Sequence, residues 1–431
     1  FICYLFWMDK KESIGQSHAL WIPVVWMFLA GSRTLSQWFA LGTVIDPLEA
    51  YSEGSPLDRD IYLVLIIVGI IVLLLRKPDW NQLLSRNKWL WLYFAFCLFS
   101  ILWSDESFVS FKRWVKALGT VVMVLIIMTD NRPNDALGTC MRRLSFLLIP
   151  LSVLFIRYYP EYGRSYHLHQ VMYTGVAYSK NTLGQLCLLS GVYFSWCLLH
   201  RRGHELKTGG YRRIIIDVFF VAMTAWVLYY ANSATSLACL IIVISFFAVG
   251  KMHVFVQKPN ALLTTFIISL AFIGMLEYLF DLRNLIITAL GRESDLTSRL
   301  PMWEMLLSWD INPWIGVGYE SFWSGDRLLA IWQEWPWIIQ AHNGYLDVYL
   351  NIGLTGLAMI MIAVAIGLTK AIKHTKYDHA AGMLKIALII TALLYNWTEA
   401  AIKPIGNMMM LLLIGILDLE LNHNTKGSQS R

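Results

Sequence analysis

Residues 343–368 read NGYLDVYLNIGLTGLAMIMIAVAIGL, and after a short polar start nearly every position is apolar. A helix of about 20 apolar residues is long enough to cross the hydrocarbon core of a bilayer. Comparable apolar runs recur along the 431-residue chain, of which 57% is hydrophobic and 15% is charged. A soluble domain carries about 25% charged residues. The sequence therefore predicts an all-α, polytopic integral membrane protein.

Twelve segments have the composition of a membrane span. They are 19–41, 61–75, 89–103, 114–129, 143–157, 182–199, 213–230, 234–250, 262–280, 343–368, 383–398 and 405–421. Phe1–Trp7 reads as the end of a further helix. No linker divides the chain, so we expect residues 1–431 to form a single membrane domain. The six cysteines lack the spacing of metal ligands, and we expect them to be small apolar residues within helices.

The distribution of lysine and arginine indicates the orientation of the helices, because cytoplasmic connections carry an excess of both residues. One side of the predicted topology holds 21 of them and the other holds 12. The side with 21 consists of the connections 8–18, 76–88, 130–143, 200–213, 251–261 and 369–381 and the tail after 421. That side is predicted to be cytoplasmic. The longest connection, 281–342, is then extracytoplasmic.

Basic residues on the predicted outer side are concentrated in two connections. One connection holds Arg157, Arg164 and Lys180 together with His167 and His169, and the long loop holds Arg283, Arg292, Arg299 and Arg327. Positive charge on this side runs against the usual bias, so it favours an anionic ligand such as a phosphate. The alternative is that long loops are translocated whatever their charge.

The long loop contains the sequence SRLPMWEMLLSW (298–309), which predicts a short amphipathic helix. Ser298 suits the position that caps a helix, and Pro301 suits the first turn. Arg299 then lies in that first turn, at the membrane surface. There it either contacts an anionic group or only extends its side chain toward water. The sequence NPWIGVGY (312–319) follows, and its two glycines predict a tight turn.

His342 lies where the loop re-enters the membrane. A histidine at the water–lipid boundary can exchange a proton near neutral pH, which favours a catalytic role over that of a structural interfacial residue. Asp347 falls one helical turn after Asn343, and we assign it to orienting His342. Arg33 lies near the outer end of its helix and contacts either the substrate or a neighbouring carbonyl. Charged residues near other outer helix ends, namely Glu277, Glu399 and Lys403, are assigned to interfacial solvation.

Several of these motifs together carry a resemblance to a known family. They are GSRTLSQW (31–38), PEYGR (160–164), GVAYSKNTLG (175–184), RxxxW (299–303), NPWIGVGY (312–319), HNGYL (342–346) and GLTG (353–356). In this combination the chain resembles the Wzy/WaaL-like O-antigen ligase and polymerase family of membrane glycosyltransferases, and within it the ExoQ-like exopolysaccharide-production branch. The region 291–356 carries most of the family signature.

The resemblance implies an enzyme of the bacterial inner membrane whose active face is extracytoplasmic. Its donor would be an undecaprenyl-diphosphate-linked oligosaccharide and its acceptor a glycan or a lipid-linked sugar hydroxyl. The family works without a metal or other cofactor, and no nucleic-acid partner is expected; other polysaccharide-assembly proteins of the bilayer are possible partners. The motif histidine falls on His342, as the base, and the motif arginine on Arg299, at the diphosphate.

One departure from the family pattern concerns the outer turn ANSATSL (231–237). Relatives often carry arginine or lysine in this turn, where the chain has Ala234. We therefore expect other outer residues to supply the charge, namely Arg164, Arg292 and above all Lys180 beside Asn181. The expected substrate-binding set is completed by Asn343, Asp347 and Arg33.

Two other functions compete with that of a transferase. A transporter or flippase of lipid-linked oligosaccharide should show charges near the middle of the membrane and broken helices in two halves of the chain. The sequence has few such charges and no visible internal repeat. A purely structural membrane protein would leave the arrangement of His342 and Arg299 without a purpose. Polymerisation is favoured over ligation, although no motif specifies the acceptor.

Overall fold

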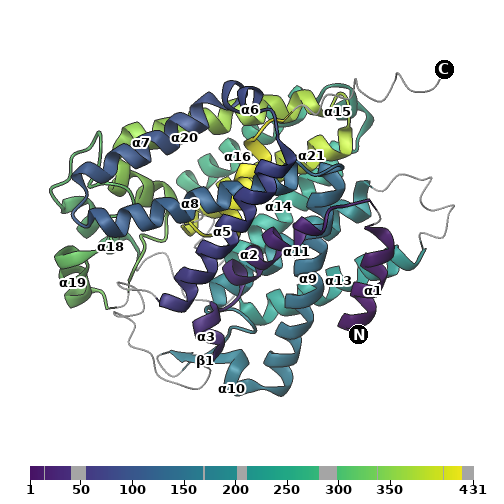
Figure 1. Cartoon of the computed structure of the whole chain (residues 1–431), viewed down its shortest axis with the longest axis horizontal. Helices are drawn as coiled ribbons and strands as arrows, with labels where there is room; N and C mark the ends of the chain where they lie inside the picture. Colours follow the sequence, from purple (N-terminus) through teal and green to yellow (C-terminus); the bar gives the residue numbers. More distant parts are fainter. Residues whose placement is uncertain are drawn as a thin grey trace.

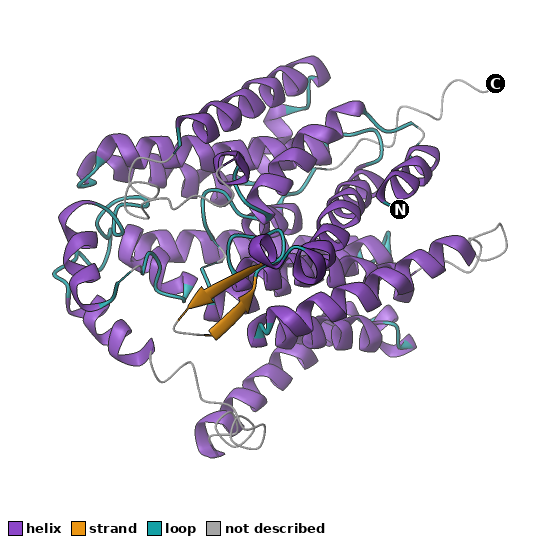
Figure 2. Ribbon diagram, turned by 90° about the horizontal axis from the view of Figure 1, so that it is seen from below, coloured by secondary structure: helices purple, strands orange, loops and turns teal. Residues whose placement is uncertain are grey.

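The computed structural model of the chain is a bundle of helices with one small two-stranded sheet (Figure 1). It describes residues 1–13, 15–39, 55–167, 170–200, 211–280, 299–336, 338–400 and 402–419. The prediction of an all-α architecture is confirmed. The sequence patterns did not predict the antiparallel hairpin of β1 (Arg164–His167) and β2 (Gln170–Tyr173), which lies among the helices in Figure 2.

The described chain before the hairpin is helical apart from its connections. The elements are α1 (Ile2–Glu12), η1 (His18–Leu20), α2 (Trp21–Gly31), α3 (Leu35–Phe39), α5 (Pro56–Arg76), α6 (Trp80–Arg86), α7 (Lys88–Phe99), η2 (Ser100–Trp103), α8 (Ser107–Met128), α9 (Pro133–Tyr158) and the short α10 (Pro160–Gly163).

The rest of the described chain is helical after the hairpin. The elements are α11 (Lys180–His200), α13 (Tyr211–Ala231), α14 (Ala234–Gly250), α15 (His253–Gln257), α16 (Pro259–Phe280), α18 (Arg299–Ser308), α19 (Gly325–Glu334), α20 (Gly344–His374), α21 (His379–Thr398) and α22 (Asn407–Ile416). The predicted loop helix is thus present as α18.

Each of the twelve predicted spans overlaps a helix, but fewer helices have the length and composition of a full span. Within the described residues there are five, in α9, α11, α13, α20 and α21, and six if α5 and the sharply bent α6 form one span. The protein is therefore a multi-pass membrane protein, while twelve spans and the extracytoplasmic side of the loop stay predictions.

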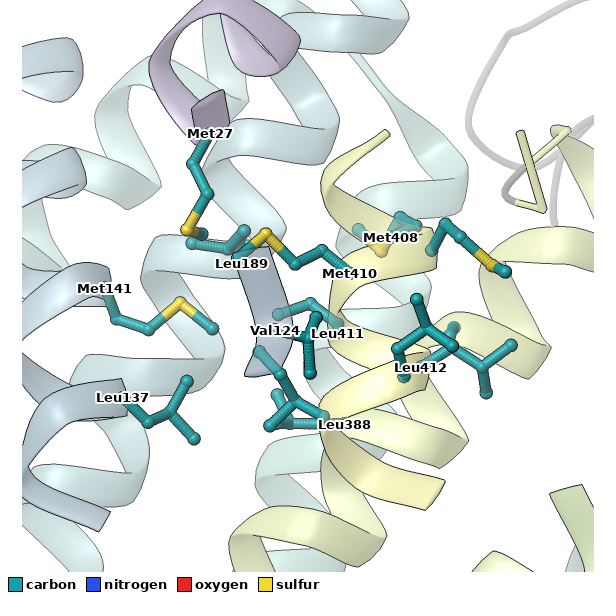
Figure 3. Packing of buried hydrophobic residues seen from close by; sticks show 14 of the residues in the cluster. Met27, Val124, Leu137, Met141, Leu189, Leu388, Met408, Met410, Leu411 and Leu412 are labelled. Atoms are coloured by element: carbon teal, nitrogen blue, oxygen red, sulfur yellow. The ribbon is translucent and has the colours of Figure 1, made fainter. Parts of the chain in front are cut away.

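The segment 405–421 differs most from its prediction as a full span. Its helix α22 has only ten residues, and all ten are buried. It packs against α2, α8, α20 and α21, so it lies inside the bundle and not against lipid. Figure 3 shows side chains of α22, including Met408, Met410, Leu411 and Leu412, among those of Met27, Val124, Met141, Leu189 and Leu388.

Helix α20 is broken at Gly353, where the backbone has φ 67° and ψ −171°. The break leaves backbone groups without partners inside the helix, and the turn at 312–318 supplies these partners. Four hydrogen bonds join the two segments: Val317 N to Leu350 O (3.3 Å), Gly318 N to Asn351 O (2.8 Å), Leu354 N to Pro313 O (2.9 Å) and Thr355 N to Trp314 O (3.0 Å). Because unpaired backbone groups are costly away from water, this turn and the break stabilise each other.

The predicted turn at 312–319 has the backbone that its glycines suggest. Gly316 and Gly318 have φ of 63° and 104°, a region that glycine reaches without the steric cost of a side chain. A Cβ atom on Gly316 would also meet the backbone of Asn351 on α20. Close contact with α20 therefore requires glycine at this position, and the turn shapes the loop as predicted.

The remainder of the loop has its own apolar core, separate from the main core of the bundle. Its buried side chains come from α18, α19 and the segments beside them, and include Met302, Leu306, Phe322, Trp323, Leu328 and Ile331. Figure 1 shows α18 and α19 together at one edge of the molecule. A packed core of this kind holds the described part of the loop against the first half of α20, which contributes Leu350.

Replacement of Gly353 by alanine is expected to destabilise the protein by about 2 kcal/mol or more, because the backbone conformation disfavours a side chain and the added Cβ would meet the backbone of Trp314. The measurement is thermal unfolding in detergent. Gly274→Ala in α16 is the control, since among the described residues no atom beyond the adjacent part of its own helix lies within 4 Å of the position that its methyl group would take. An unchanged unfolding temperature for Gly353→Ala would contradict the tight packing of turn and break.

Candidate functional site

Glu399 lies at the centre of a polar cluster, immediately after the end of α21, and is only 6% exposed. Its Oε1 accepts a hydrogen bond from Asn181 Nδ2 (2.8 Å) and lies 3.4 Å from Arg299 Nη2. Its Oε2 lies 3.1 Å from His342 Nδ1 and 3.5 Å from Gln340 Nε2. A buried carboxylate needs such partners, because burying an unpaired charge is very unfavourable. One carboxylate thus joins the two predicted catalytic residues.

Arg299 begins α18 and reaches the end of α21. Its Nη1 donates to the carbonyl oxygen of Thr398 (2.6 Å) and lies 3.4 Å from the carbonyl oxygen of His342. The last carbonyls of a helix lack intrahelical partners and form its negative end, where a cation is favourable. Arg299 therefore joins three segments: the loop helix, the end of α21 and the backbone at His342.

His342 lies two residues before α20 and has a left-handed backbone conformation, with φ of 48°. Its side chain is 29% exposed, whereas that of Glu399 is 8% exposed. A carboxylate accepts and cannot donate, so the neutral imidazole that fits this contact carries its proton on Nδ1. The Nε2 atom then has a free lone pair. A ring held in this way can accept a proton from a substrate hydroxyl.

Asn343 and Asp347 hold the start of α20 in place. The Asn343 side chain caps α20 by accepting from the backbone nitrogens of Tyr345 and Leu346. Asp347 Oδ1 accepts from Trp323 Nε1 (2.8 Å) and from the backbone nitrogen of Ala341 (3.0 Å), while Oδ2 lies 3.6 Å from Lys403 Nζ.

The expected role of Asp347 in orienting His342 stays a prediction, and the contact that could serve it is with the backbone. Asp347 binds the backbone of the residue before His342, and the carboxylate at the ring is that of Glu399. The assignment of Glu399 to interfacial solvation was wrong, because this carboxylate is buried and contacts Asn181, Arg299 and His342. Lys403 lies beside the buried carboxylate of Asp347, which solvation at a helix end does not explain.

The first turns of three helices meet at residues 398–399. They are joined there by His342, which lies two residues before a fourth helix, α20. Asn181 of α11, Arg299 of α18 and His342 contact residues 398–399 as described, and Thr235 of α14 contributes a hydroxyl 2.7 Å from that of Thr398. Helix N-termini carry a partial positive charge and attract anions. The helix N-termini that meet here therefore add partial positive charge beside the carboxylate of Glu399 and the negative end of α21.

The outer turn 231–237 lies beside this cluster, since Thr235 contacts Thr398. Ala234 is the first residue of α14, and Ser233 caps that helix. The position of Ala234 is therefore next to the cluster. Lys180 is the first residue of α11, directly before Asn181, and its side chain is half-buried. Lys180 is thus adjacent in sequence to a residue of the cluster, and its role as a substitute cation stays a prediction.

Arg33 and Arg164 bind the backbone around the hairpin. Arg33 donates to the carbonyl oxygens of Tyr162 (2.6 Å) and Gly175 (3.1 Å), and Arg164 donates to that of Ile156 (3.1 Å). Of the two alternatives for Arg33, the structure thus shows contact with neighbouring carbonyls. These hydrogen bonds hold in place the segment between α9 and α11, which contains the hairpin. Arg292, and with it Arg283, lies outside the described residues.

Sequence reasoning missed three members of the cluster: Glu399, Gln340 and the Thr398 carbonyl. Glu399 follows the long apolar run of α21, and an ionisable residue at the end of such a run is a functional candidate by default. That signal was present in the sequence. The partner of Glu399 was not, because 57 residues separate it from His342 and no spacing rule joins them.

Comparison with known proteins places this cluster in a family context. Residues 218–361 match a family model described as O-antigen ligase. The chain is also 25% identical over 307 residues to a protein of Rhizobium meliloti (strain 1021) named exopolysaccharide production protein ExoQ, and the match covers 66% of each chain. The resemblance seen in the motifs is thereby confirmed. The family match includes Arg299 and His342, whereas Asn181 and Glu399 lie outside it.

A double-mutant cycle of Arg299→Gln and Glu399→Gln is expected to give a coupling energy of roughly 0.5–3 kcal/mol in the free energy of unfolding, because the two side chains share a buried network. The control is a cycle of Arg327→Gln and Asp105→Asn. This pair has a contact of 2.8 Å, but its carboxylate is 49% exposed, so we expect coupling of at most about 1 kcal/mol. Equal coupling in both cycles would contradict a special role of burial at Glu399.

Proposed function

We propose that the protein is a membrane glycosyltransferase of exopolysaccharide or O-antigen assembly. It moves a glycan from an undecaprenyl-diphosphate carrier to an acceptor sugar hydroxyl at the outer face of the bacterial inner membrane. The observation that carries the proposal is the contact of 3.1 Å between His342 Nδ1 and the buried Glu399, which leaves Nε2 available as a base. The match of residues 218–361 to the O-antigen ligase model and the similarity to ExoQ support the same class of reaction.

The proposed reaction is a direct displacement at the anomeric carbon of the donor. The acceptor hydroxyl oxygen forms the new bond to that carbon, and its proton passes to His342 Nε2. The bond between the anomeric carbon and the phosphate oxygen breaks, and the diphosphate leaves with the electron pair. A single displacement inverts the anomeric centre and needs no covalent intermediate on the protein. General base catalysis of this kind typically contributes about 10²–10⁴ in rate.

The leaving diphosphate requires positive charge. Arg299 is proposed to contribute its guanidinium, since arginine matches the geometry of phosphate oxygens. The helix N-termini that meet at residues 398–399 add partial positive charge that needs no rearrangement during the reaction. Lys180 beside Asn181 is the proposed replacement for the cation missing at Ala234. Asn343 and Asp347 are proposed to support substrate binding indirectly, because they hold the backbone around His342 in place.

Glu399 is proposed to be a positioning residue. It holds the imidazole by Nδ1, stabilises the imidazolium that forms when Nε2 takes the proton, and keeps Arg299 in the same cluster. A carboxylate in this position serves a catalytic histidine in the same way in serine hydrolases. The family match ends before Glu399, so its role is an inference from the geometry alone.

Replacement of His342 by alanine is expected to abolish glycan transfer, and Arg299→Ala is expected to do the same, because each removes a group of the proposed reaction. The test expresses each variant in the source bacterium after deletion of its own copy and measures the polymerised glycan and the lipid-linked precursor. The control is His253→Ala, which removes an exposed histidine at the start of α15. Membrane insertion of each variant is checked by its amount in the membrane fraction.

The location of the precursor separates a transferase from a transporter. A transferase defect leaves lipid-linked glycan on the outer face, where added glycosidase or lectin reaches it. Precursor trapped on the inner face would overturn the proposal in favour of a flippase. Normal glycan from His342→Ala would overturn the assignment of the base.

The variant Glu399→Gln is expected to lower the transfer rate by about 10²–10⁴, because the amide no longer favours the proton on Nδ1. Glu399→Asp, which keeps the charge, should retain more activity than Glu399→Gln. The measurement is the transfer rate with purified donor lipid, together with its dependence on pH. If Glu399→Gln lost stability but kept the full rate, Glu399 would be structural and no positioning residue.

A further inference from the structure

A second polar site lies at the start of α7, between this helix and the later part of α20. It is a cavity of about 210 Å³. Its wall consists of Ser85, Arg86, Asn87, Lys88, Trp89, Leu90, Ala363, Ile366, Gly367, Lys370 and Ile416. Gly367 lies 23 residues after the start of α20, which at 1.5 Å per residue is about 35 Å along the helix from the end that adjoins His342. The cavity is therefore separate from the cluster around Glu399.

Three cations, Arg86, Lys88 and Lys370, line the cavity, and their charge exceeds that of the carboxylate beside them. Arg86 Nη1 lies 3.1 Å from Asp418 Oδ2, and Lys370 Nζ lies 3.8 Å from the same oxygen. Asp418 thus faces two cations, and Lys88 adds a third positive charge at an exposed position. Counted over the described residues that line the cavity and Asp418 beside them, positive charge is in excess, which favours an anion.

The polar groups of the cavity are held in place by several contacts. The buried Asn87 donates through Nδ2 to the carbonyl oxygens of Leu83 (2.9 Å) and Asp418 (3.1 Å). Its Oδ1 accepts from the backbone nitrogen of Asp418 (3.1 Å). Lys370 Nζ donates to the carbonyl oxygen of Arg86. Hydrogen bonds therefore link the end of α6, the start of α7, the end of α22 and Lys370 of α20 around the cavity.

The cavity also has an apolar wall and lies at a position that suits a membrane surface. Leu90, Ala363 and Ile416 are buried along its apolar side. Helix α6 is bent by 111° from the apolar α5, and a polar helix bent in this way can lie along the interface. Trp80 and Trp89 are each 40% exposed, and tryptophan is enriched at membrane–water interfaces. The sequence predicts this side to be cytoplasmic.

We propose that this cavity binds a phosphate group, carried by an anionic phospholipid of the inner leaflet. The head-group phosphate would contact Arg86, Lys88 and Lys370, and the acyl chains would lie along α7 and α20. Basic pockets between membrane helices on the cytoplasmic side bind anionic lipid head groups elsewhere. This inference is independent of the proposed transferase activity, since it concerns different residues. A bound lipid would join α7, α20 and α22.

The test compares lipid retention by the purified full chain in native mass spectrometry, with phosphatidylglycerol, zwitterionic phosphatidylethanolamine and inorganic phosphate as separate probes. Wild-type protein is expected to retain phosphatidylglycerol in preference to the zwitterionic lipid. Lys88→Gln should weaken retention about five-fold, and Lys88→Gln with Lys370→Gln about 25-fold, because each cation near a surface contributes about 1 kcal/mol.

The control variant is Lys373→Gln with Lys376→Gln, which removes the same charge from exposed positions at and just after the end of α20, outside the cavity. It should retain phosphatidylglycerol like the wild type. The single variant Lys88→Gln is expected to fold normally, because Lys88 is exposed at the edge of the cavity, so weaker retention by this variant reports on binding. Equal retention by wild type and both cavity variants would overturn the site. Lysine-dependent binding of inorganic phosphate without phosphatidylglycerol would overturn the lipid as its source.

Discussion

The docking of the turn 312–318 on the break in α20 is the interaction on which the rest of the site depends. A helix interrupted at Gly353 leaves backbone groups that neither lipid nor the helix itself can satisfy, and the turn satisfies four of them. The same contact fixes the first half of α20. Asp347 in this half binds the backbone nitrogen of Ala341, the residue before His342, and Asn343, the residue after His342, caps the helix. The position of the imidazole therefore follows from backbone pairing some ten residues further along the chain.

Glu399 brings the charged and polar side chains of the site together. Its carboxylate is nearly buried, and its cost of burial is offset by a guanidinium, an amide and an imidazole from three separate helical segments. Removal of one partner leaves the others poorly matched, so these residues behave as a unit. The unit combines a base held in one tautomer with the positive ends of helices, which is what a hydroxyl nucleophile and an anionic leaving group each require.

The sequence was informative where a local pattern has a direct physical cause. Apolar runs predicted helices, Arg299 was predicted at the start of a loop helix, and the two glycines of 312–319 predicted a turn. The length of a helix inside the bundle was less accessible, because α22 is apolar whether it faces lipid or protein. The carboxylate in contact with the His342 imidazole was not predicted, and Asp347, the nearer residue in sequence, holds the backbone of Ala341. The partner of the imidazole, Glu399, is brought there only by the packing of α21 against α20.

The complete burial of α22 has a consequence for biogenesis. At 1.5 Å per residue its ten residues extend about 15 Å, half of a typical hydrocarbon core, so this helix is too short to be a membrane anchor on its own. The buried position that α22 occupies forms only when α2, α8, α20 and α21 pack around this helix. All four of these helices precede α22 in the chain, so they are synthesised before it. Closure of the bundle therefore has to wait until α22 itself has been synthesised.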